Sequence, residues 1–149
     1  MQRNWSDPIS LGSITLKNRV FMAALTRVRC DINENIPTPL VAEYYAQRSG
    51  AGLILSEATS WSPRGNGFPG AACLYNRQQM EGWKLVLDAV HAKGGILFLQ
   101  IFHAGRVTHP LINNNLEIWA PSAIAVREPI RSLEGASYPV PKEMTLEDI

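Results

Sequence analysis

Cysteine is scarce in this sequence. Cys30 and Cys73 are the two cysteines among 149 residues, and they lie far apart along the chain. At that spacing they form neither a zinc-ligand pattern nor a C-x-x-C redox motif, and two thiols do not make a disulfide framework. The scarcity of cysteine therefore argues against a disulfide-stapled domain and a metal site, and it favours a reduced, cytoplasmic chain.

An excess of charge of either sign is also missing. The 14 Lys and Arg residues nearly balance the 13 Asp and Glu residues, which leaves a net charge of +1. Proteins that bind nucleic acid or an anionic membrane through their charge carry a basic excess. No apolar run approaches the roughly 20 residues of a membrane-spanning helix, and residues 1–7 lack the apolar region of a secretion signal. We therefore expect neither a nucleic-acid nor a membrane partner.

A glycine-rich phosphate loop is the third absence. Residues 61–70 are rich in glycine and proline, but their spacing fits neither G-x-G-x-x-G nor G-x-x-x-x-G-K-[ST]. An unrelated phosphate-binding α/β protein would need such a loop, so that interpretation has no motif to support it. A long loop after a strand is either a lid over a ligand or surface covering.

Three short apolar runs are present, and each passes into polar residues at its C-terminal end. They predict strands at about 20–25, 53–57 and 96–102. Such runs between turn signals are typical of strands buried on both faces of a parallel sheet. The third run holds one polar residue, Gln100, whose buried amide would need hydrogen-bond partners. A neighbouring backbone group or a ligand at this end of the strand could equally supply them.

Helical patterns separate these strands. Thr38-Pro39 is a favourable helix start before apolar residues at helical spacing. Asn76, with Gln79 three residues later, resembles a capping box that opens a second helix. Strand, helix, strand, helix, strand is the order of βαβ units in a parallel sheet. Alternating apolar residues at about 8–17 predict a hairpin before the first strand.

The length of the chain limits how much of such a fold it holds. A complete (β/α)8 barrel takes about 250 residues, so 149 residues with about three βα units do not close one. Thr145–Asp148 has the [ST]-x-x-[DE] form of a helix start, and the sequence stops one residue later. The sequence thus predicts an α/β chain in which residues 1–149 are the N-terminal portion of one TIM-barrel domain, without an internal domain boundary.

Several segments resemble motifs of one family. Leu16–Arg27 is similar to the L-K-N-R-x-x-M-A-P-L-T-R opening of the old yellow enzymes, which are FMN-dependent ene-reductases and NADPH dehydrogenases with a (β/α)8 barrel. Ser56–Thr59 resembles the family's TEG/SEA segment, and Gln100–Arg106 resembles its Q-L-W-H-x-G-R segment. Ala120–Ile124 and Pro141–Ile149 resemble the later A-P-S-A-I and P-R-x-L-T-x-x-E-I pieces. The resemblance extends in order over nearly the whole chain.

The resemblance implies flavin contacts for five residues. Thr26 corresponds to the hydroxyl that donates to flavin O4 and tunes the electron affinity of N5, because a donor there stabilises negative charge on the reduced ring. Gln100 corresponds to the amide that pairs with the pyrimidine edge of the ring. Ala24 and Leu25 would contact the ring through backbone groups, and Ala58 would offer its N–H where a small side chain lets the flat ring approach.

Three positions depart from the family pattern. Ala24 stands where the family usually has proline, although its backbone carbonyl is still available. Phe102 stands where many members have tryptophan near the substrate, and Phe68 lies near a position that is often tyrosine. Phe68 and Phe102 are therefore expected in the substrate pocket, with one hydroxyl fewer than usual.

The function implied by the resemblance is hydride transfer. An FMN-dependent oxidoreductase of this kind passes hydride from NADPH, or NADH, through flavin N5 to a small activated alkene such as an enone. Similar proteins carry, after their fourth strand, a His/Asn or His/His pair that binds the substrate carbonyl and a tyrosine that protonates the alkene. They also carry later arginines for the FMN phosphate, and this sequence has no counterpart of these residues. The 149-residue chain alone is therefore expected to be inactive. The alternative is a truncated, non-catalytic barrel fragment that self-associates or pairs with a complementing C-terminal barrel half.

Overall fold

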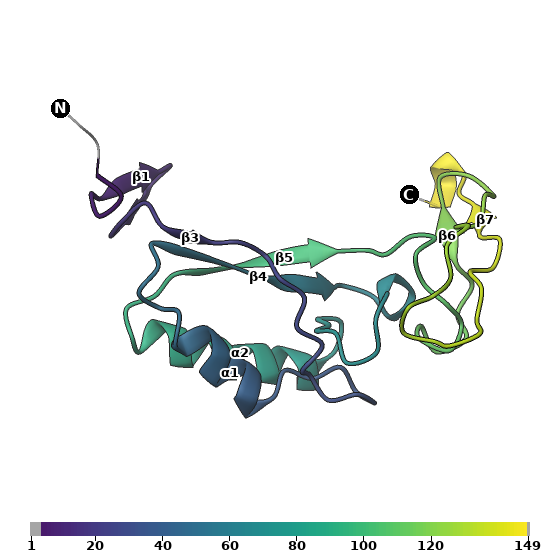
Figure 1. Cartoon of the computed structure of the whole chain (residues 1–149), viewed down its shortest axis with the longest axis horizontal. Helices are drawn as coiled ribbons and strands as arrows, with labels where there is room; N and C mark the ends of the chain where they lie inside the picture. The colour runs from purple at the N-terminus through teal and green to yellow at the C-terminus, as the bar shows by residue number, and fades with distance from the viewer. Residues whose placement is uncertain (1–3, 149) are drawn as a thin grey trace.

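A three-stranded parallel sheet forms the centre of the computed structural model, which describes residues 4–148. The strands β3 (Phe21–Met22), β4 (Leu53–Ser60) and β5 (Leu97–Phe102) lie side by side in chain order. The helices α1 (Pro39–Ala46) and α2 (Arg77–His91) connect them and cover one face of the sheet (Figure 1). The predicted order of strand and helix in a parallel α/β sheet is confirmed.

Both helices begin at the expected residues. Thr38 is the N-cap of α1 in an extended conformation, and Pro39 follows at the first position. At the start of α2, the Asn76 side chain accepts the Gln79 N–H at 2.9 Å. Gln79 Oε1 in turn accepts the Tyr75 N–H at 2.9 Å, one residue before the partner that a symmetrical capping box would use.

The hydrophobic core lies between the two helices and the sheet. Tyr45 from α1 and Trp83 and Val86 from α2 are almost completely buried there. From the sheet side, Ile54 of β4 and Leu97 of β5 pack into the same cluster. The core is therefore a single layer of side chains between one sheet face and two helices.

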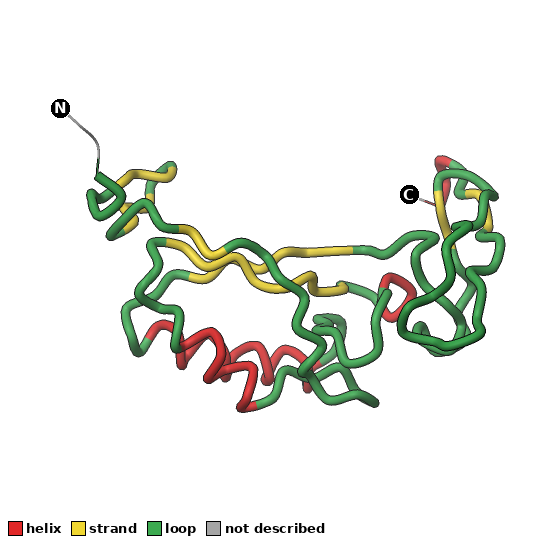
Figure 2. The backbone as a smooth tube through the Cα atoms, viewed as in Figure 1, coloured by secondary structure: helices red, strands yellow, loops and turns green. Residues whose placement is uncertain are grey.

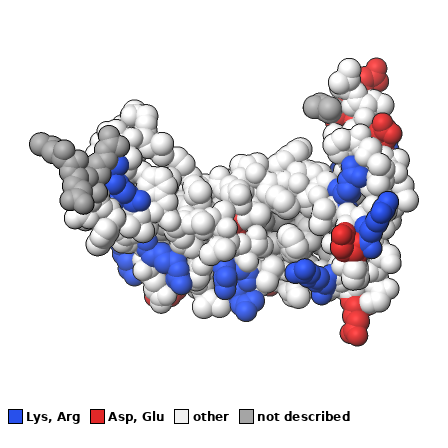
Figure 3. Space-filling model, turned by 45° about the horizontal axis from the view of Figure 1, so that its top comes forward, with Lys and Arg blue, Asp and Glu red and all other residues white. Residues whose placement is uncertain are grey.

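The opposite face of the sheet has no covering layer in the described part of the chain (Figure 2). Phe21 and Phe98 on this face are 47% and 39% exposed. The space-filling view shows a hollow above the sheet that is almost free of charged side chains (Figure 3). The prediction that the third strand is buried on both faces is wrong for this chain, because three strands do not curl far enough to enclose the second face.

The strand bounds also differ from those expected from the apolar runs. β3 covers Phe21–Met22 instead of 20–25, because the chain continues from Ala23 outside the regular ladder. β4 extends past the apolar run to Ser60, where its polar residues still pair with β5. An apolar run indicates which side chains are buried. The strand itself is defined by backbone pairing, which also includes polar residues.

Two small elements rise from opposite ends of the sheet (Figure 1). At the N-terminal end, β1 (Ile9–Leu11) and β2 (Ile14–Leu16) form an antiparallel hairpin whose turn includes Gly12 at φ +57°. At the other end, β6 (Trp119–Ala120) and β7 (Lys142–Glu143) form a short parallel pair. No helix among residues 4–148 is both long and apolar enough to span a membrane.

Candidate functional site

A β-bulge in β4 organises the carboxyl-terminal half of the sheet. Leu55 of β4 pairs with Phe98 of β5, and Ala58 pairs with Gln100. Between these pairs, β4 has two residues, Ser56 and Glu57, where β5 has one. Bulges of this kind occur often beside active sites, where they re-aim side chains.

Ser56 connects the bulge to β5. Its side chain is fully buried, and its Oγ accepts the backbone N–H of Gln100 at 2.9 Å. The same hydroxyl donates to the Glu57 carbonyl at 2.8 Å. A side chain of β4 therefore fixes the backbone of β5 at the residue whose amide is predicted to contact a ligand.

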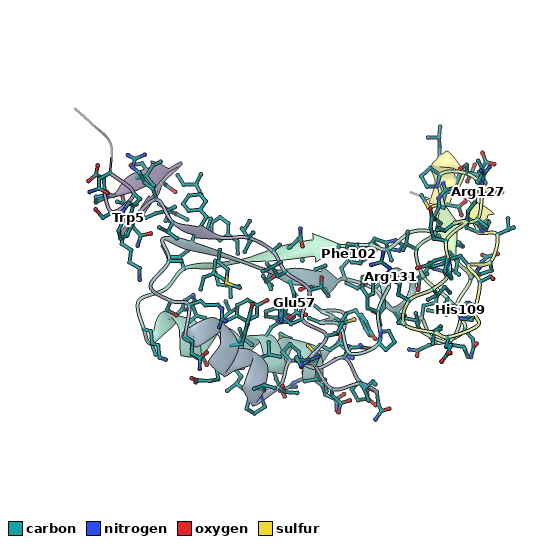
Figure 4. The ribbon with its side chains drawn as sticks, in the orientation of Figure 1. Trp5, Glu57, Phe102, His109, Arg127 and Arg131 are labelled. Carbon is teal, nitrogen blue, oxygen red and sulfur yellow. The ribbon has the colours of Figure 1, made fainter. Side chains whose placement is uncertain are left out.

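Glu57 connects the bulge to the segment after β3 and to α1. Its carboxylate is fully buried and lies between the sheet and the helices (Figure 4). Oε2 accepts the backbone N–H of Arg27 at 3.2 Å, and the Tyr45 hydroxyl lies 3.5 Å from Oε1. The Glu57 N–H donates to the Tyr45 hydroxyl oxygen at 2.7 Å. The network thus joins three separate segments of the chain.

Burial raises the pKa of the Glu57 carboxyl above its ordinary value of 4.5. The Arg27 and Val28 backbone N–H groups, the Tyr45 hydroxyl and the Arg27 charge oppose this shift but do not cancel it. The cause is the loss of hydration of a carboxylate that has no ion pair within residues 4–148. Folding consequently shifts the equilibrium of Glu57 toward the protonated form relative to a hydrated carboxyl.

This shift predicts a pH-dependent stability that Glu57→Gln removes. Because the folded-state pKa is raised, the contribution of Glu57 to stability is complete below about pH 4.5 and is lost as the pH rises through the folded-state pKa. We expect the difference in the free energy of unfolding, Glu57→Gln minus wild type, to increase as the pH rises. Urea denaturation between about pH 4 and pH 8 measures it.

Glu43→Gln on the exposed side of α1 is the matched control, and it should follow the wild type at every pH. If Glu57→Gln has the same pH dependence as the wild type and this control, the carboxyl does not titrate with a raised pKa.

Gln100 lies on the uncovered face of the sheet. Its neighbours Leu97 and Leu99 pack against the core, so the alternation along β5 directs Phe98 and Gln100 to the other side. The Gln100 side chain forms no hydrogen bond with any residue between 4 and 148, and it is exposed. The alternative that a neighbouring backbone group satisfies this amide therefore finds no support in the described chain.

The remaining expected contacts come from the two other strands. Ala58 is the register partner of Gln100 and is partly buried. Thr26 is exposed in the extended segment after β3, directly before the Arg27 N–H that Glu57 holds. Ala24 is partly buried and Leu25 is 51% exposed in the same segment. Three adjacent segments therefore bring these residues to the carboxyl half of one sheet.

Phe68 and Phe102 occupy different surroundings. Phe68 lines a cavity of about 270 Å³ whose other walls come from residues 107–138, and none of the expected flavin contacts belongs to it. Phe102 ends β5 and is half-buried close to Gly67 (Figure 4). Their place in a substrate pocket stays a prediction.

Two other groups of reactive side chains are accounted for by packing. Burial raises the pKa of the Cys73 thiol to about 12 and raises that of Cys30 as well, so both thiols are protonated and inert at neutral pH. Burial and the nearby Arg64 charge lower the pKa of His103, whose Nδ1 accepts the Gly105 N–H at 3.0 Å. Among residues 4–148 no cluster of three metal-ligating side chains occurs.

Sequence reasoning missed the role of the bulge. It singled out Ser56–Thr59 as a similar motif but assigned no contacts to Ser56 or Glu57. The available signal was the acidic Glu57 immediately after an apolar strand, because a buried carboxylate needs donors. The identity of those donors depends on register, which the sequence does not show.

Comparison with known proteins gives a consistent match. The model of the NADH:flavin oxidoreductase / NADH oxidase family matches residues 6–149. The 12-oxophytodienoate reductase 7 of Oryza sativa subsp. japonica is 40% identical in a match that covers 96% of this chain and 37% of that protein. A probable flavin mononucleotide-dependent alkene reductase of Leishmania infantum is 38% identical, over 95% of this chain and 40% of that protein.

A solved structure extends the match to the fold. The old yellow enzyme homologue from Zymomonas mobilis superposes with a TM-score of 0.92 at 39% identity, over 98% of this chain and 41% of that chain. The described sheet and helices are therefore the first part of a (β/α)8 barrel. The chain spans about two fifths of the length of the relatives it matches.

Proposed function

Because the chain belongs to the NADH:flavin oxidoreductase / NADH oxidase family, that of the old yellow enzymes, we propose that it forms the FMN-contacting first part of an alkene-reducing barrel. The family is FMN-dependent and takes hydride from a nicotinamide nucleotide. For this chain we propose NADPH, or NADH, as the donor and a small activated alkene of the enone type as the acceptor. We further propose a cytoplasmic location, which the scarcity of cysteine supports.

The observation that carries this proposal is a pair of polar groups, the Gln100 amide on the uncovered sheet face and the Thr26 hydroxyl in the exposed segment after β3. The Thr26 hydroxyl and the Gln100 amide form no hydrogen bonds with described residues, and Ala58 lies opposite Gln100 without a bulky side chain. A flat molecule with alternating donors and acceptors along one edge fits this arrangement, since Phe21 and Phe98 leave an apolar surface beside it. FMN is such a molecule, and the pyrimidine ring of its flavin carries that edge.

Each residue has a definite task in this proposal. FMN, when bound, supplies the capacity to accept and donate hydride. Gln100 orients the ring through its amide, which both donates and accepts. Thr26 presents a hydroxyl donor where negative charge develops, and Ala58 leaves room for close approach of its N–H. Ala24 and Leu25 contribute backbone groups from the same segment.

A titration tests the proposal. The remaining part of the Zymomonas homologue can be joined after residue 149, so that a complete barrel presents this chain's residues to FMN. We expect a yellow protein that quenches FMN fluorescence and oxidises NADPH in the presence of a cyclic enone. A folded chimaera that stays colourless with excess FMN would contradict the assignment.

Gln100→Leu in this chimaera is expected to weaken FMN binding. A hydrogen bond contributes about 0.5–1.5 kcal/mol net, and more is lost when the partner edge is left buried and unpaired. The dissociation constant should therefore rise roughly threefold to tenfold or more. Gln78→Leu, the same change at an exposed residue of α2, is the control and should leave the affinity unchanged. Equal affinities in both variants would remove Gln100 from the flavin site.

A second candidate function is association without catalysis. The observation in its favour is the uncovered, apolar and nearly uncharged face of the sheet, because large exposed apolar surfaces commonly mark interaction sites. In this case the partner is a second copy or a complementing C-terminal barrel half.

A further inference from the structure

We propose that the bulge of β4, Ser56-Glu57, positions the two polar side chains that contact the flavin. Glu57 fixes the Thr26 segment and Ser56 fixes Gln100, so both are positioning residues that act through the backbones of their neighbours. The inference rests on the proposed function for the identity of the ligand. The positioning itself is a property of the chain alone.

Both bulge residues are fully buried, and each makes its polar contacts inside the protein. Ser56 contacts β5 through the Gln100 N–H, whereas Glu57 contacts α1 and the segment after β3. Beyond the bulge, Ala58 still pairs with Gln100. The two bulge residues therefore connect β4 to different neighbours while the ladder continues.

Each buried side chain then supplies an acceptor to one flanking segment. Ser56 Oγ accepts the Gln100 N–H at 2.9 Å, and Glu57 Oε2 accepts the Arg27 N–H at 3.2 Å. β3 pairs with β4 only at Phe21 and Met22, so the ladder does not extend to Thr26. The hydrogen bond to the Glu57 carboxylate therefore holds this segment beside the carboxyl half of β4.

Tyr45 fixes the bulge itself. The bulge leaves the Glu57 N–H directed at the helices, where the Tyr45 hydroxyl oxygen accepts it at 2.7 Å. The hydroxyl also approaches Glu57 Oε1 at 3.5 Å. The Tyr45 hydroxyl therefore links the bulge to α1, whose buried residues belong to the packed core.

Paired variants of the full 149-residue chain test the inference. Ser56→Ala removes the acceptor for Gln100, and Glu57→Leu removes the acceptor for Arg27. Glu57→Gln keeps an oxygen acceptor and serves as the conservative rescue. Ser49→Ala is the matched control. Ser49 is also a buried serine, but its hydroxyl donates to the carbonyl of Val90 on α2 and makes no contact with the bulge.

Residue-resolved hydrogen exchange is the first measurement. Ser56→Ala should speed exchange of the Gln100 amide at least about tenfold and leave Arg27 unchanged, since a lost hydrogen bond of ordinary strength has about that effect. Glu57→Leu should do the reverse, and Glu57→Gln and Ser49→Ala should change neither amide. Equal exchange of both amides in every variant would overturn the inference.

FMN titration of the same variants is the second measurement. Ser56→Ala and Glu57→Leu should each raise the dissociation constant about fivefold and shift the flavin absorption bands, whereas Glu57→Gln and Ser49→Ala should match the wild type. Altered exchange with unchanged FMN affinity and spectrum would overturn the positioning role toward the flavin. When the same titration is made in the chimaera, a wild-type protein that takes up no FMN would contradict the proposed function, and the exchange pattern would then decide the inference alone.

Discussion

Purified by itself, the 149-residue chain is expected to sediment as an oligomer and to oxidise no NADPH in the presence of an enone. The physical reason for association is the uncovered sheet face, on which Phe21 and Phe98 are exposed together with few charges. Burial of apolar surface stabilises by roughly 25 cal/mol per Å². A sheet with bare outer strands also offers unpaired backbone groups to another chain.

The absence of turnover has a separate cause. The chain supplies one edge of a flavin site through Thr26, Ala58 and Gln100. The resemblance also implies a substrate-binding His/Asn or His/His pair, a proton-donating tyrosine and phosphate-binding arginines, and none of these has a counterpart among its 149 residues. Catalysis by such groups depends on their simultaneous presence in one geometry.

Sedimentation velocity and an NADPH-oxidation assay with added FMN measure these outcomes. Phe98→Lys places a charge on the uncovered face and should shift the distribution toward monomer, because burial of that charge is costly. Leu85→Lys is the matched control, since Leu85 is an exposed leucine on α2. A soluble wild-type monomer that turns over would contradict both the expected association and the assignment of the missing groups.

The second large effect is expected for Trp83→Ala. Trp83 is 2% exposed on α2, lies 6.3 Å from the Tyr45 ring between centroids, and is the largest side chain of the core. Truncation of a buried tryptophan costs about 3–5 kcal/mol, because transfer and cavity terms add. Small domains are stable by only about 5–15 kcal/mol, and this chain has a single core layer. We therefore expect Trp83→Ala to be largely unfolded at 25 °C.

Circular dichroism and urea denaturation at low protein concentration check this expectation. Trp61→Ala is the control, because it removes the same side chain from an exposed position that is 56% accessible. The control should change the free energy of unfolding little. A Trp83→Ala variant that unfolds with the wild-type urea midpoint would show that the core does not depend on the contact between α2 and the sheet.

Much of the fold follows from local chemistry in the sequence. Thr38-Pro39 and the Asn76 cap mark the helix starts correctly, because both depend on residues within one turn. The hairpin at Gly12 is equally local, since a positive φ there favours glycine. The burial of the third strand was predicted wrongly, because an apolar run does not show how many strands share the sheet.

Only part of the candidate site could be predicted from the sequence. Gln100 stood out as a polar residue within an apolar run, and the family motifs pointed to Thr26 and Ala58. The bulge was hidden, because the register of β4 on β5 is a long-range property. Two hydrogen bonds depend on that register, from the Arg27 N–H to Glu57 and from the Glu57 N–H to Tyr45. No local pattern in the sequence indicates them.

The number of strands in the sheet also limits how copies of this chain can assemble edge to edge. The sheet has three parallel strands with β3 and β5 at its edges, so the β5 edge of one copy can continue into the β3 edge of the next. Such a contact is heterologous and repeats until a ring closes. Closure of a (β/α)8 barrel needs eight strands, and no whole number of three-stranded copies supplies eight. Self-association by this route has no preferred endpoint, and its products should form a concentration-dependent series of sizes.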